Sequence, residues 1–230
     1  METKGIQQFM NSYSVKMVVV SVLAILLLIP SFLIQDIISE RIALSEKVKS
    51  ELYVRWGERQ VVSGPVLNVP FLIRGQGEGD QGIKERQGVV HFLPELLKAE
   101  GVLYPEIRKR GIYEAVVYQA KIRLQGSFDQ IDFARAGVPD ADYNWSAAYF
   151  TIGISDMRGI KDIPEFVVNG RKYNVEPGVA DADLFQSGIT IKVNLPDIKQ
   201  ITNFETELIL NGSEVLSFEA LGKKSEVELS

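Results

Sequence analysis

Residues 17–34 read Met-Val-Val-Val-Ser-Val-Leu-Ala-Ile-Leu-Leu-Leu-Ile-Pro-Ser-Phe-Leu-Ile, and the rest of the chain is interpreted around this stretch. These eighteen residues carry no charge, and thirteen of them are Val, Leu, Ile or Phe. As a helix the stretch would be about 27 Å long, close to the thickness of the hydrocarbon core of a bilayer. Summed over the apolar side chains, insertion is favourable by roughly 4 to 8 kcal/mol. The sequence therefore predicts a transmembrane helix over residues 17–35.

Two other interpretations of this stretch compete with a transmembrane helix. A cleaved secretory signal has a shorter apolar core and a small-x-small cleavage site, and residues 29–33 (Ile-Pro-Ser-Phe-Leu) offer no such site. A core helix of a soluble protein is usually shorter and has a polar face, which this stretch lacks. We therefore expect a retained anchor, in which Pro30 lies near the exit end, where a kink is tolerated.

The charges on either side of the anchor predict its orientation. Residues 1–16 form a short polar tail that carries Lys4, Lys16 and the free amino group against Glu2, whereas Asp36 and Glu40 follow the anchor. Cytoplasmic flanks are enriched in Lys and Arg. We therefore expect a cytoplasmic N-terminal tail over residues 1–16 and everything after Asp36 on the opposite side of the membrane.

Residues 36–57 are predicted to continue the helix out of the membrane. Ile37, Leu44, Val48 and Leu52 fall within about 80° of one another at 100° per residue, and most charged residues lie elsewhere. This apolar stripe is compatible with a dimerising stalk or with a helix that lies on the protein's own sheet. Because three turns are too few to indicate a coiled coil, the second interpretation is favoured.

The remaining residues, 58–230, have the pattern of a β domain. Residues 67–73 alternate between apolar and other positions, and in residues 116–124 the even positions are apolar, so we expect Val116 to Leu124 to bury one face of a strand. Asn169-Gly170 and Asn211-Gly212 each predict a tight hairpin. The expected fold is mostly β with α: the helix, then an antiparallel β domain built as a sandwich or a curled sheet. Residues 222–230 resemble the start of a strand, so we expect this domain to be incomplete at its C-terminus.

Composition excludes several kinds of site. The net charge is −5 and the Lys and Arg residues are scattered, which argues against a nucleic-acid partner. The chain has no cysteine and a single histidine, His91, so it cannot build a thiolate or multi-histidine metal site. Asp181 and Asp183, near Glu176, match no calcium-loop spacing and are interpreted as a solvated acidic loop. We therefore predict no metal ion and no cofactor.

His91 could act as a general base, which makes a hydrolase one alternative. The residues 153–157 (Gly-Ile-Ser-Asp-Met) depart from the Gly-x-Ser-x-Gly pattern at the last position, and His91 lies in a predicted strand. A histidine in such a place is more often a hydrogen-bonded structural residue. Asp156 and Arg158 are interpreted as a local ion pair in a polar turn, and no catalytic residue is assigned.

Ile29-Pro30 leads into Glu40-Arg41, and further along the chain come residues 62–67, 91–95, 105–113, 154–160 and 176–178. In this order, these stretches together resemble the CreD family of bacterial inner-membrane proteins. The resemblance covers nearly the whole chain from about residue 15, with two departures, Met157 where the family often has proline and the region 176–183. The family-motif positions have no known role and are Gly64, Pro65, His91, Pro94, Glu95, Arg110, Gly111, Tyr113, Asp156, Arg158 and Gly159.

The resemblance implies a bacterial inner-membrane protein that is linked to envelope stress, colicin tolerance and the β-lactam response. It also implies further transmembrane helices beyond this segment, and no established reaction. Our functional expectation is a non-enzymatic protein with a periplasmic β domain that acts by interaction. Its expected partners are the lipid bilayer and either envelope proteins or a second copy. The alternatives are a membrane-anchored envelope hydrolase that uses His91, and a part of a transporter.

Overall fold

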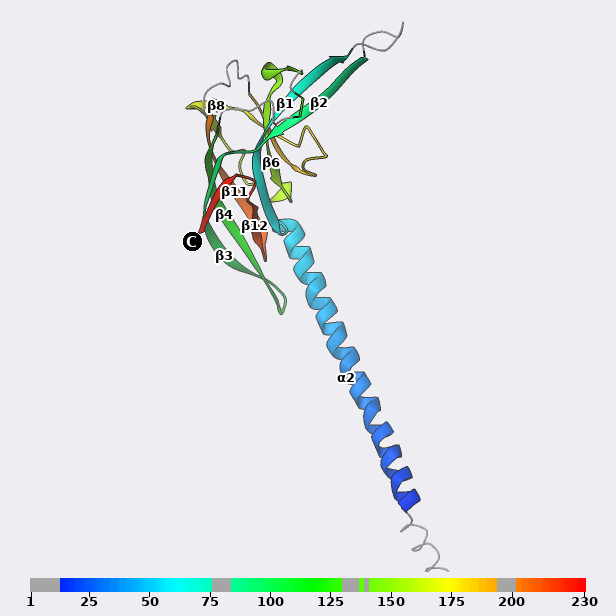
Figure 1. Ribbon diagram of the computed structural model, residues 1–230. Coiled ribbons are helices and arrows are strands. Elements are labelled where there is room, and N and C mark those ends of the chain that lie inside the picture. Colours follow the sequence, from blue (N-terminus) through cyan, green and yellow to red (C-terminus); the bar gives the residue numbers. More distant parts are fainter. Residues whose placement is uncertain (1–12, 76–83, 130–136, 139–140, 194–201) are drawn as a thin grey trace, which may run out of the picture. The chain divides into compact units, whose positions relative to one another are not determined.

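The computed structural model describes residues 13–75, 84–129, 137–138, 141–193 and 202–230. Among them are one α-helix and thirteen strands in two sheets, so the expectation of a mostly β chain with an N-terminal helix is confirmed (Figure 1). Residues 1–12 of the predicted tail lie outside the described residues. The chain divides into two compact units, Met1–Ser50 and Glu51–Ser230, which are described separately below.

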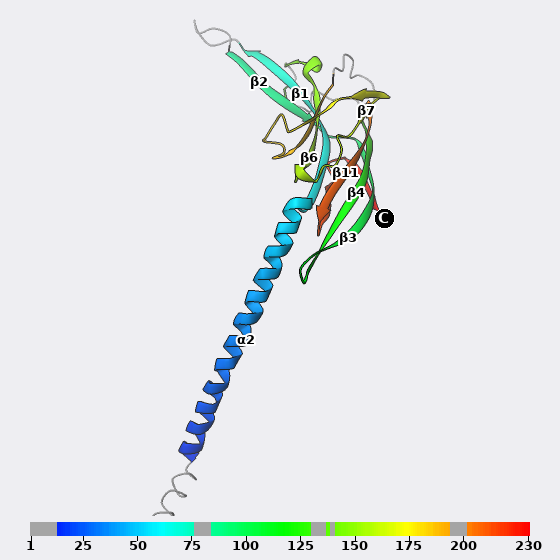
Figure 2. The ribbon, with the colours of Figure 1, turned by 180° about the vertical axis from the view of Figure 1, so that it is seen from behind.

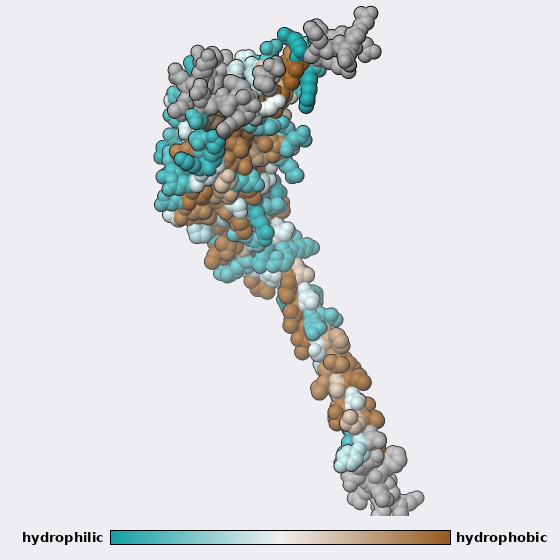
Figure 3. All heavy atoms as spheres, viewed as in Figure 1, coloured by the Kyte–Doolittle hydropathy of each residue, from teal (hydrophilic) through white to brown (hydrophobic). Residues whose placement is uncertain are grey.

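Helix α2 (Tyr13–Trp56) joins the predicted anchor and the predicted juxtamembrane segment without a break, and Pro30 lies inside it. Its 44 residues correspond to about 66 Å of helix, of which a bilayer core needs about 30 Å. The large apolar side chains of this stretch are exposed, and the face of the helix seen in Figure 3 is coloured largely as hydrophobic. The helix is long and apolar enough to cross a membrane. Ile37 and Leu44 of the predicted stripe are 59% and 42% exposed.

The strands of the second unit form a seven-stranded and a six-stranded sheet (Figures 1 and 2). Sheet A has the order β12 (Leu216–Glu219), β1 (Gln60–Gly75), β6 (Tyr149–Ile154), β10 (Gly188–Lys192) and β9 (Val175–Pro177), with β2 (Lys84–Phe92) and β5 (Asp142–Tyr143) also paired to β1. Sheet B has the order β13 (Lys224–Leu229), β3 (Leu96–Arg110), β4 (Tyr113–Phe128), β11 (Thr202–Ser213), β7 (Phe166–Val168) and β8 (Arg171–Tyr173). Two 3₁₀ turns, Trp145–Ala147 and Met157–Gly159, flank β6.

Most strand pairs are antiparallel, as the sequence predicted. The exceptions are β12, which runs parallel to β1, and β13, which runs parallel to β3. These two short strands follow each other in the chain and lie at the edge of different sheets. The last part of the chain therefore adds one edge strand to each sheet.

The two sheets pack face to face around one apolar core, so the body is a sandwich. Side chains of both sheets are fully buried there, among them Leu67 and Ile152 of sheet A and Leu124 of sheet B. Phe150 of β6 links the sheets, because its ring lies 5.5 Å from that of Phe128 in β4. Burial of such rings and aliphatic side chains is the main stabilising term of the fold.

Strand β4 alternates as predicted over most of its length, but Val116 does not belong to the buried face. Val116 is 53% exposed, whereas Ala115 and Val117 are buried. Cross-strand partners share a face, and Ala115 is paired with Arg108 of β3. The Arg108 guanidinium lies over the ring of Trp56 at the end of α2, so this end of β4 buries the opposite face.

The two Asn-Gly pairs have different outcomes. Asn169-Gly170 forms the predicted two-residue hairpin between β7 and β8, with both residues at positive φ. The hairpin predicted at Asn211-Gly212 is wrong, because both residues continue β11 beside β4. Gly212 is required there because a Cβ would lie 2.4 Å from the Tyr118 hydroxyl oxygen. The chain turns only at Glu214, which has a φ of 57°.

Candidate functional site

The family-motif residues do not meet in one place. They fall at five locations: the junction where α2 gives way to β1 (Asp156, Arg158 and Gly159), the tip of the β3–β4 hairpin (Arg110, Gly111 and Tyr113), a bulge in the middle of β1 (Gly64 and Pro65), the β1–β2 pair (His91) and the segment after β2 (Pro94 and Glu95). The junction has the densest polar contacts among them, so it is the strongest candidate for a site with a role.

Asp156 is the centre of the junction, just after β6. Its side chain is buried and accepts hydrogen bonds from the backbone N–H groups of Glu58 (2.9 Å) and Arg158 (3.1 Å). The Arg158 guanidinium donates to both carboxylate oxygens, at 2.8 and 2.9 Å, and also pairs with the Glu58 carboxylate at 3.1 Å. The predicted local Asp–Arg contact is present. In addition, Asp156 holds the first residues after the helix.

Gln60 is the second buried polar residue of the junction. Its side chain is fully buried and donates to the backbone carbonyls of Asp156 (3.1 Å) and Asn211 (3.0 Å). Gly159 lies against the same groups, because a Cβ there would be 2.3 Å from both the Gln60 side-chain nitrogen and the Asn211 oxygen. A glycine is therefore needed at 159 for close approach. The network therefore joins β1 and β6 of sheet A to β11 of sheet B.

The charges of the junction stabilise each other. Burial by itself raises the pKa of Asp156, but the hydrogen bonds from the Arg158 side chain and from the two backbone amides outweigh it and leave the pKa below its usual range. The same hydrogen bond raises the pKa of Arg158, with a further contribution from Glu58. Asp156 is thus held as a carboxylate at neutral pH, as a structural acceptor.

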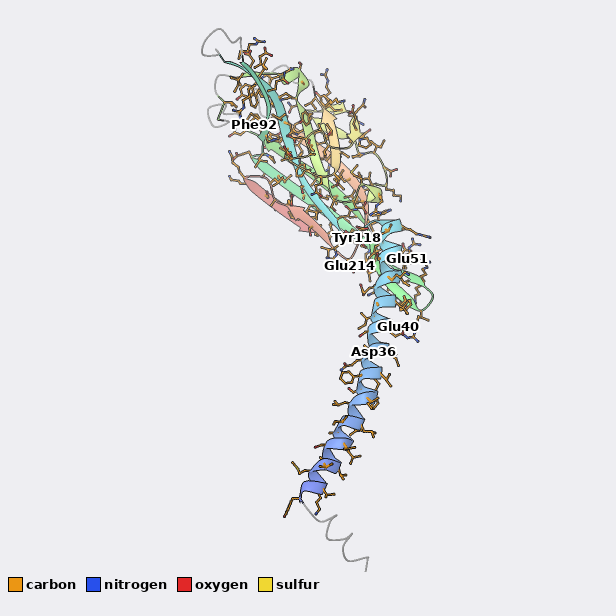
Figure 4. All side chains as sticks on the ribbon, turned by 90° about the vertical axis from the view of Figure 1, so that its right-hand side faces the viewer. Asp36, Glu40, Glu51, Phe92, Tyr118 and Glu214 are labelled. Atoms are coloured by element: carbon orange, nitrogen blue, oxygen red, sulfur yellow. The ribbon has the colours of Figure 1, made fainter. Side chains whose placement is uncertain are left out.

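The tip of the β3–β4 hairpin holds the last turn of the helix from another side. Arg110 pairs with Glu51, and the indole N–H of Trp56 donates to the backbone carbonyl of Tyr118 at 3.1 Å. Figure 4 labels Glu51 on the helix close to where it meets the strands, together with Tyr118 and Glu214. Burial raises the pKa of Tyr118 to about 12, and its hydroxyl donates to the carbonyl of Val215.

Two further motif residues build the turn of this hairpin. Gly111 adopts a φ of 62°, in the left-handed region that favours glycine, and open space surrounds its Cα. Tyr113 begins β4 and is half-buried, paired with Arg110 across the turn. These positions therefore shape the hairpin that contacts α2.

Gly64 and Pro65 lie in the middle of β1 and are joined by a cis peptide bond. The register of β1 against β6 shifts between Ser63 and Val66, so the two residues form a bulge. Gly64 has a φ of 91°, and a Cβ there would lie 3.0 Å from the carbonyl oxygen of Thr151. Their visible role is to bend the long strand that runs through sheet A.

His91 is paired with Asn68 across β2 and β1. Its Nδ1 is hydrogen-bonded to the side-chain oxygen Oδ1 of Asn68 at 2.7 Å, and its Nε2 lies 3.7 Å from the Asp181 carboxylate. Asn68 is fully buried and donates in turn to Thr151, whose hydroxyl is buried. Within the described residues, the recorded side-chain partners of His91 are thus an amide and a carboxylate, not a serine hydroxyl.

Tyr149 lies in the same region. Burial, with a smaller contribution from the Asp181 carboxylate, raises its pKa. Asp181 also accepts a hydrogen bond from the backbone of Asp183, which closes the acidic loop on itself. In the part of the chain that the structure describes, no group of three His, Asp or Glu residues is arranged to hold a metal ion.

Pro94 and Glu95 follow β2 and fix the last strand. Pro94 is buried, its carbonyl accepts from the backbone of Lys223, and the Glu95 carboxylate pairs with the Lys223 ammonium. These contacts start the parallel pairing of β13 with β3. The contacts of Pro94 and Glu95 thus fix where the last strand begins.

Sequence reasoning did not single out Glu58, Gln60 or Asn211 as site residues. Their partners lie far away in the chain: Gln60 bonds to residues 96 and 151 positions later. The available signal was a polar residue, Gln60, at the start of a strand that is otherwise apolar, next to the turn at Gly57. A pattern within one strand does not reveal a partner in another sheet.

Comparison with known proteins places this arrangement in a family. The family model described as Inner membrane protein CreD matches residues 12–230. Inner membrane protein CreD of Escherichia coli (strain K12) is 29% identical over 211 residues, which cover 90% of this chain and 46% of that protein. The chain thus spans about half the length of this curated relative, and no solved structure matches. The chain belongs to the CreD family of inner membrane proteins.

Proposed function

We propose that this chain is the tethered, non-catalytic part of a CreD-type envelope protein, with the sandwich on the periplasmic side of the inner membrane. The support for the orientation is the charge pattern: Lys16 precedes the apolar stretch, and Asp36 and Glu40 follow it. Helix α2 is long enough to span the membrane and to leave several turns outside it.

The absence of catalysis is inferred from what the motif residues do in the described part of the chain. Asp156, Arg158 and Gly159 join strands at the junction, and Gly64 with Pro65 shapes a bulge. Nucleophilic catalysis needs a nucleophile and a base in mutual reach, but the His91 ring nitrogens face Asn68 and Asp181. Motif residues that build a rigid junction suit a protein that presents a surface.

The proposed role is in envelope integrity and stress response, including colicin tolerance, with an envelope protein or a second copy as the partner. The single observation that carries it is the junction. A dense buried network at the point where the chain leaves the helix and enters the sandwich is expected if this connection matters to what the sandwich contacts.

The experiment is photo-crosslinking of the full-length protein in native membranes. A photoreactive residue is placed at Ile112, which is 79% exposed at the tip of the β3–β4 hairpin, and at Lys172 on β8. We expect a discrete protein adduct from at least one position, whose partner is identified by mass spectrometry. Adducts with lipid alone at both positions would contradict action through a protein partner.

The enzymatic alternative is tested separately by complementation. A strain lacking the protein is rescued for colicin tolerance with the wild type, His91→Gln or His91→Ala. We expect both variants to restore tolerance, because the histidine makes structural contacts only. Loss of tolerance in both variants, with normal amounts of protein in the membrane, would favour a hydrolase.

A further inference from the structure

A groove crosses the face of sheet B that points away from the core. It has a volume of about 420 Å³ and is formed by four adjacent strands, β3, β4, β11 and β7, whose order can be followed in Figures 1 and 2. Lys98, Gln125, Glu205 and Val167 lie in one row across these strands by register. In β4, Ile122 and Leu124 face the core, so the odd-numbered Gln125 faces the groove.

The charged side chains of the groove are already neutralised. The Lys98 ammonium lies 2.6 Å from the Glu100 carboxylate, and this hydrogen bond raises the pKa of Lys98 and lowers that of Glu100. Glu205 pairs with Arg123 on the neighbouring strand. A ligand with a net charge would find no unpaired counter-charge among these residues, so phosphate and carboxylate ligands are disfavoured.

The neutral polar side chains of the groove are available for hydrogen bonds. Within the part of the chain that the structure describes, the side chains of Gln125, Ser127 and Asn203 make no hydrogen bond. The Asn169 side-chain oxygen accepts from the backbone of Asn203 at 2.9 Å, which fixes the amide and leaves its NH₂ group free. Rigid strands and a tight turn thus present three amides and a hydroxyl at fixed positions.

Amide and hydroxyl groups both donate and accept hydrogen bonds, which matches the hydroxyl and acetamido groups of a sugar. Leu96, which is 45% exposed, and half-buried Val167 supply apolar contact for C–H faces and methyl groups. A peptide strand is less suitable, because the groove lies on the face of the sheet and its strands are paired on both sides. We propose that this groove binds a neutral oligosaccharide carrying N-acetyl groups.

This proposal goes beyond the proposed function and does not depend on it. The groove binds its ligand whichever side of the membrane the sandwich occupies, and whether or not the protein has a protein partner. If the binding experiment below fails, the proposed membrane topology is unaffected. If the topology proves reversed, the proposed glycan binding is unaffected.

The test uses the full chain in phosphatidylcholine nanodiscs, since maltoside detergents would themselves offer a sugar. Tetra-N-acetylchitotetraose is the probe, and binding is read by saturation-transfer difference NMR on the glycan. Because the groove is open, we expect a dissociation constant on the order of 1 mM. The acetamido methyl signals are expected to receive the strongest transfer.

Two variants and a matched control locate the site. Gln125→Ala combined with Asn203→Ala removes two hydrogen-bonding groups, at roughly fivefold each, so the signal at 1 mM glycan should fall about tenfold. The control combines Gln186→Ala with Asn174→Ala, the same substitutions at exposed positions outside the groove. It is expected to bind like the wild type.

Ser127→Leu is the second test variant, in case the double variant lowers stability. It removes the hydroxyl and narrows the groove, and it is expected to weaken binding at an unchanged melting temperature. The proposal is overturned if the wild type gives no signal at 5 mM glycan or if folded groove variants bind as the control does. Equal binding of maltotetraose, which has no acetamido group, also overturns it.

Discussion

Replacing Asp156 with asparagine tests whether the junction network stabilises the sandwich. Asp156 accepts two backbone hydrogen bonds in a buried place, from Glu58 and Arg158. Asparagine keeps the shape and one acceptor oxygen, but its NH₂ group faces the second backbone donor. A lost charge-assisted bond and an unsatisfied buried N–H together cost about 2 to 4 kcal/mol. The Arg158 side chain is half-exposed, so its ion pair is left out of this figure.

The assay is urea unfolding of the full chain in nanodiscs at pH 7, followed by tryptophan fluorescence. Trp56 lies at the junction itself, and Trp145→Phe makes it the single reporter. With a denaturant slope of about 2 kcal/mol per molar urea, a loss of about 3 kcal/mol lowers the midpoint by about 1.5 M. The slope itself should stay constant, because the same surface is exposed.

Asp162→Asn is the matched control, since Asp162 is exposed a few residues further along the chain. Its midpoint is expected to stay within about 0.3 M of the parent, as for most surface substitutions. A shift for Asp156→Asn that is no larger than that of the control would refute the reasoning, because the buried hydrogen bonds would then carry no net stability.

The remaining predictions concern the same region. Gly159→Ala should lower the free energy of unfolding by about 3 kcal/mol or more, because its Cβ would meet the Asn211 backbone carbonyl and the buried Gln60 side-chain amide. Gly111→Ala should lower it by only about 1 kcal/mol, because Gly111 has a positive φ but open space around it. Comparable melting temperatures for the two variants would contradict this. Trp56→Phe should lower the free energy of unfolding by about 1 kcal/mol, because the hydrogen bond to the Tyr118 carbonyl is lost. Chemical denaturation followed by circular dichroism measures this change. Since the pKa of Asp156 is lowered in the folded state, its stabilising effect is present above the unfolded pKa of about 3.9 and is lost as pH falls through the folded pKa. The gap between wild type and Asp156→Asn should therefore shrink below about pH 4, and a gap that widens there would contradict the sign.

Features that depend on neighbours in the chain were predictable from the sequence. The apolar helix follows from composition alone, and the hairpin at Asn169-Gly170 follows from the positive φ that these two residues tolerate. The alternation from Tyr118 to Leu124 correctly gave the core face of β4. In each case the physical cause acts within a few residues.

Features that depend on distant partners were not predictable. The same Asn-Gly signal failed at Asn211-Gly212, because there glycine makes room for the Tyr118 ring on the next strand. The parallel pairings of β12 and β13, and the bonds from Gln60 to Asp156 and Asn211, join positions far apart in the sequence. A periodicity shows which face of a strand is buried but not against which strand.

The open choice between a sandwich and a curled sheet shows the same limit. Both arrangements need the same alternating strands, and only the contact of Phe150 with Phe128 and Phe166 across the sheets distinguishes them. The motif residues were likewise recognisable as a set, but their roles were not. Asp156 became interpretable only when its bonds to the start of β1 were seen.

The most direct test of the central claim, that one helix anchors a sandwich on the periplasmic side, uses the absence of cysteine from the chain. Lys172→Cys places a single thiol on β8, where the lysine side chain is 68% exposed, and Thr3→Cys places one in the N-terminal tail. Each variant is treated in spheroplasts with a maleimide that does not cross membranes. The account predicts labelling of Lys172→Cys in intact spheroplasts and labelling of Thr3→Cys only after lysis. Labelling of Thr3→Cys in intact spheroplasts, with Lys172→Cys protected until lysis, would contradict it.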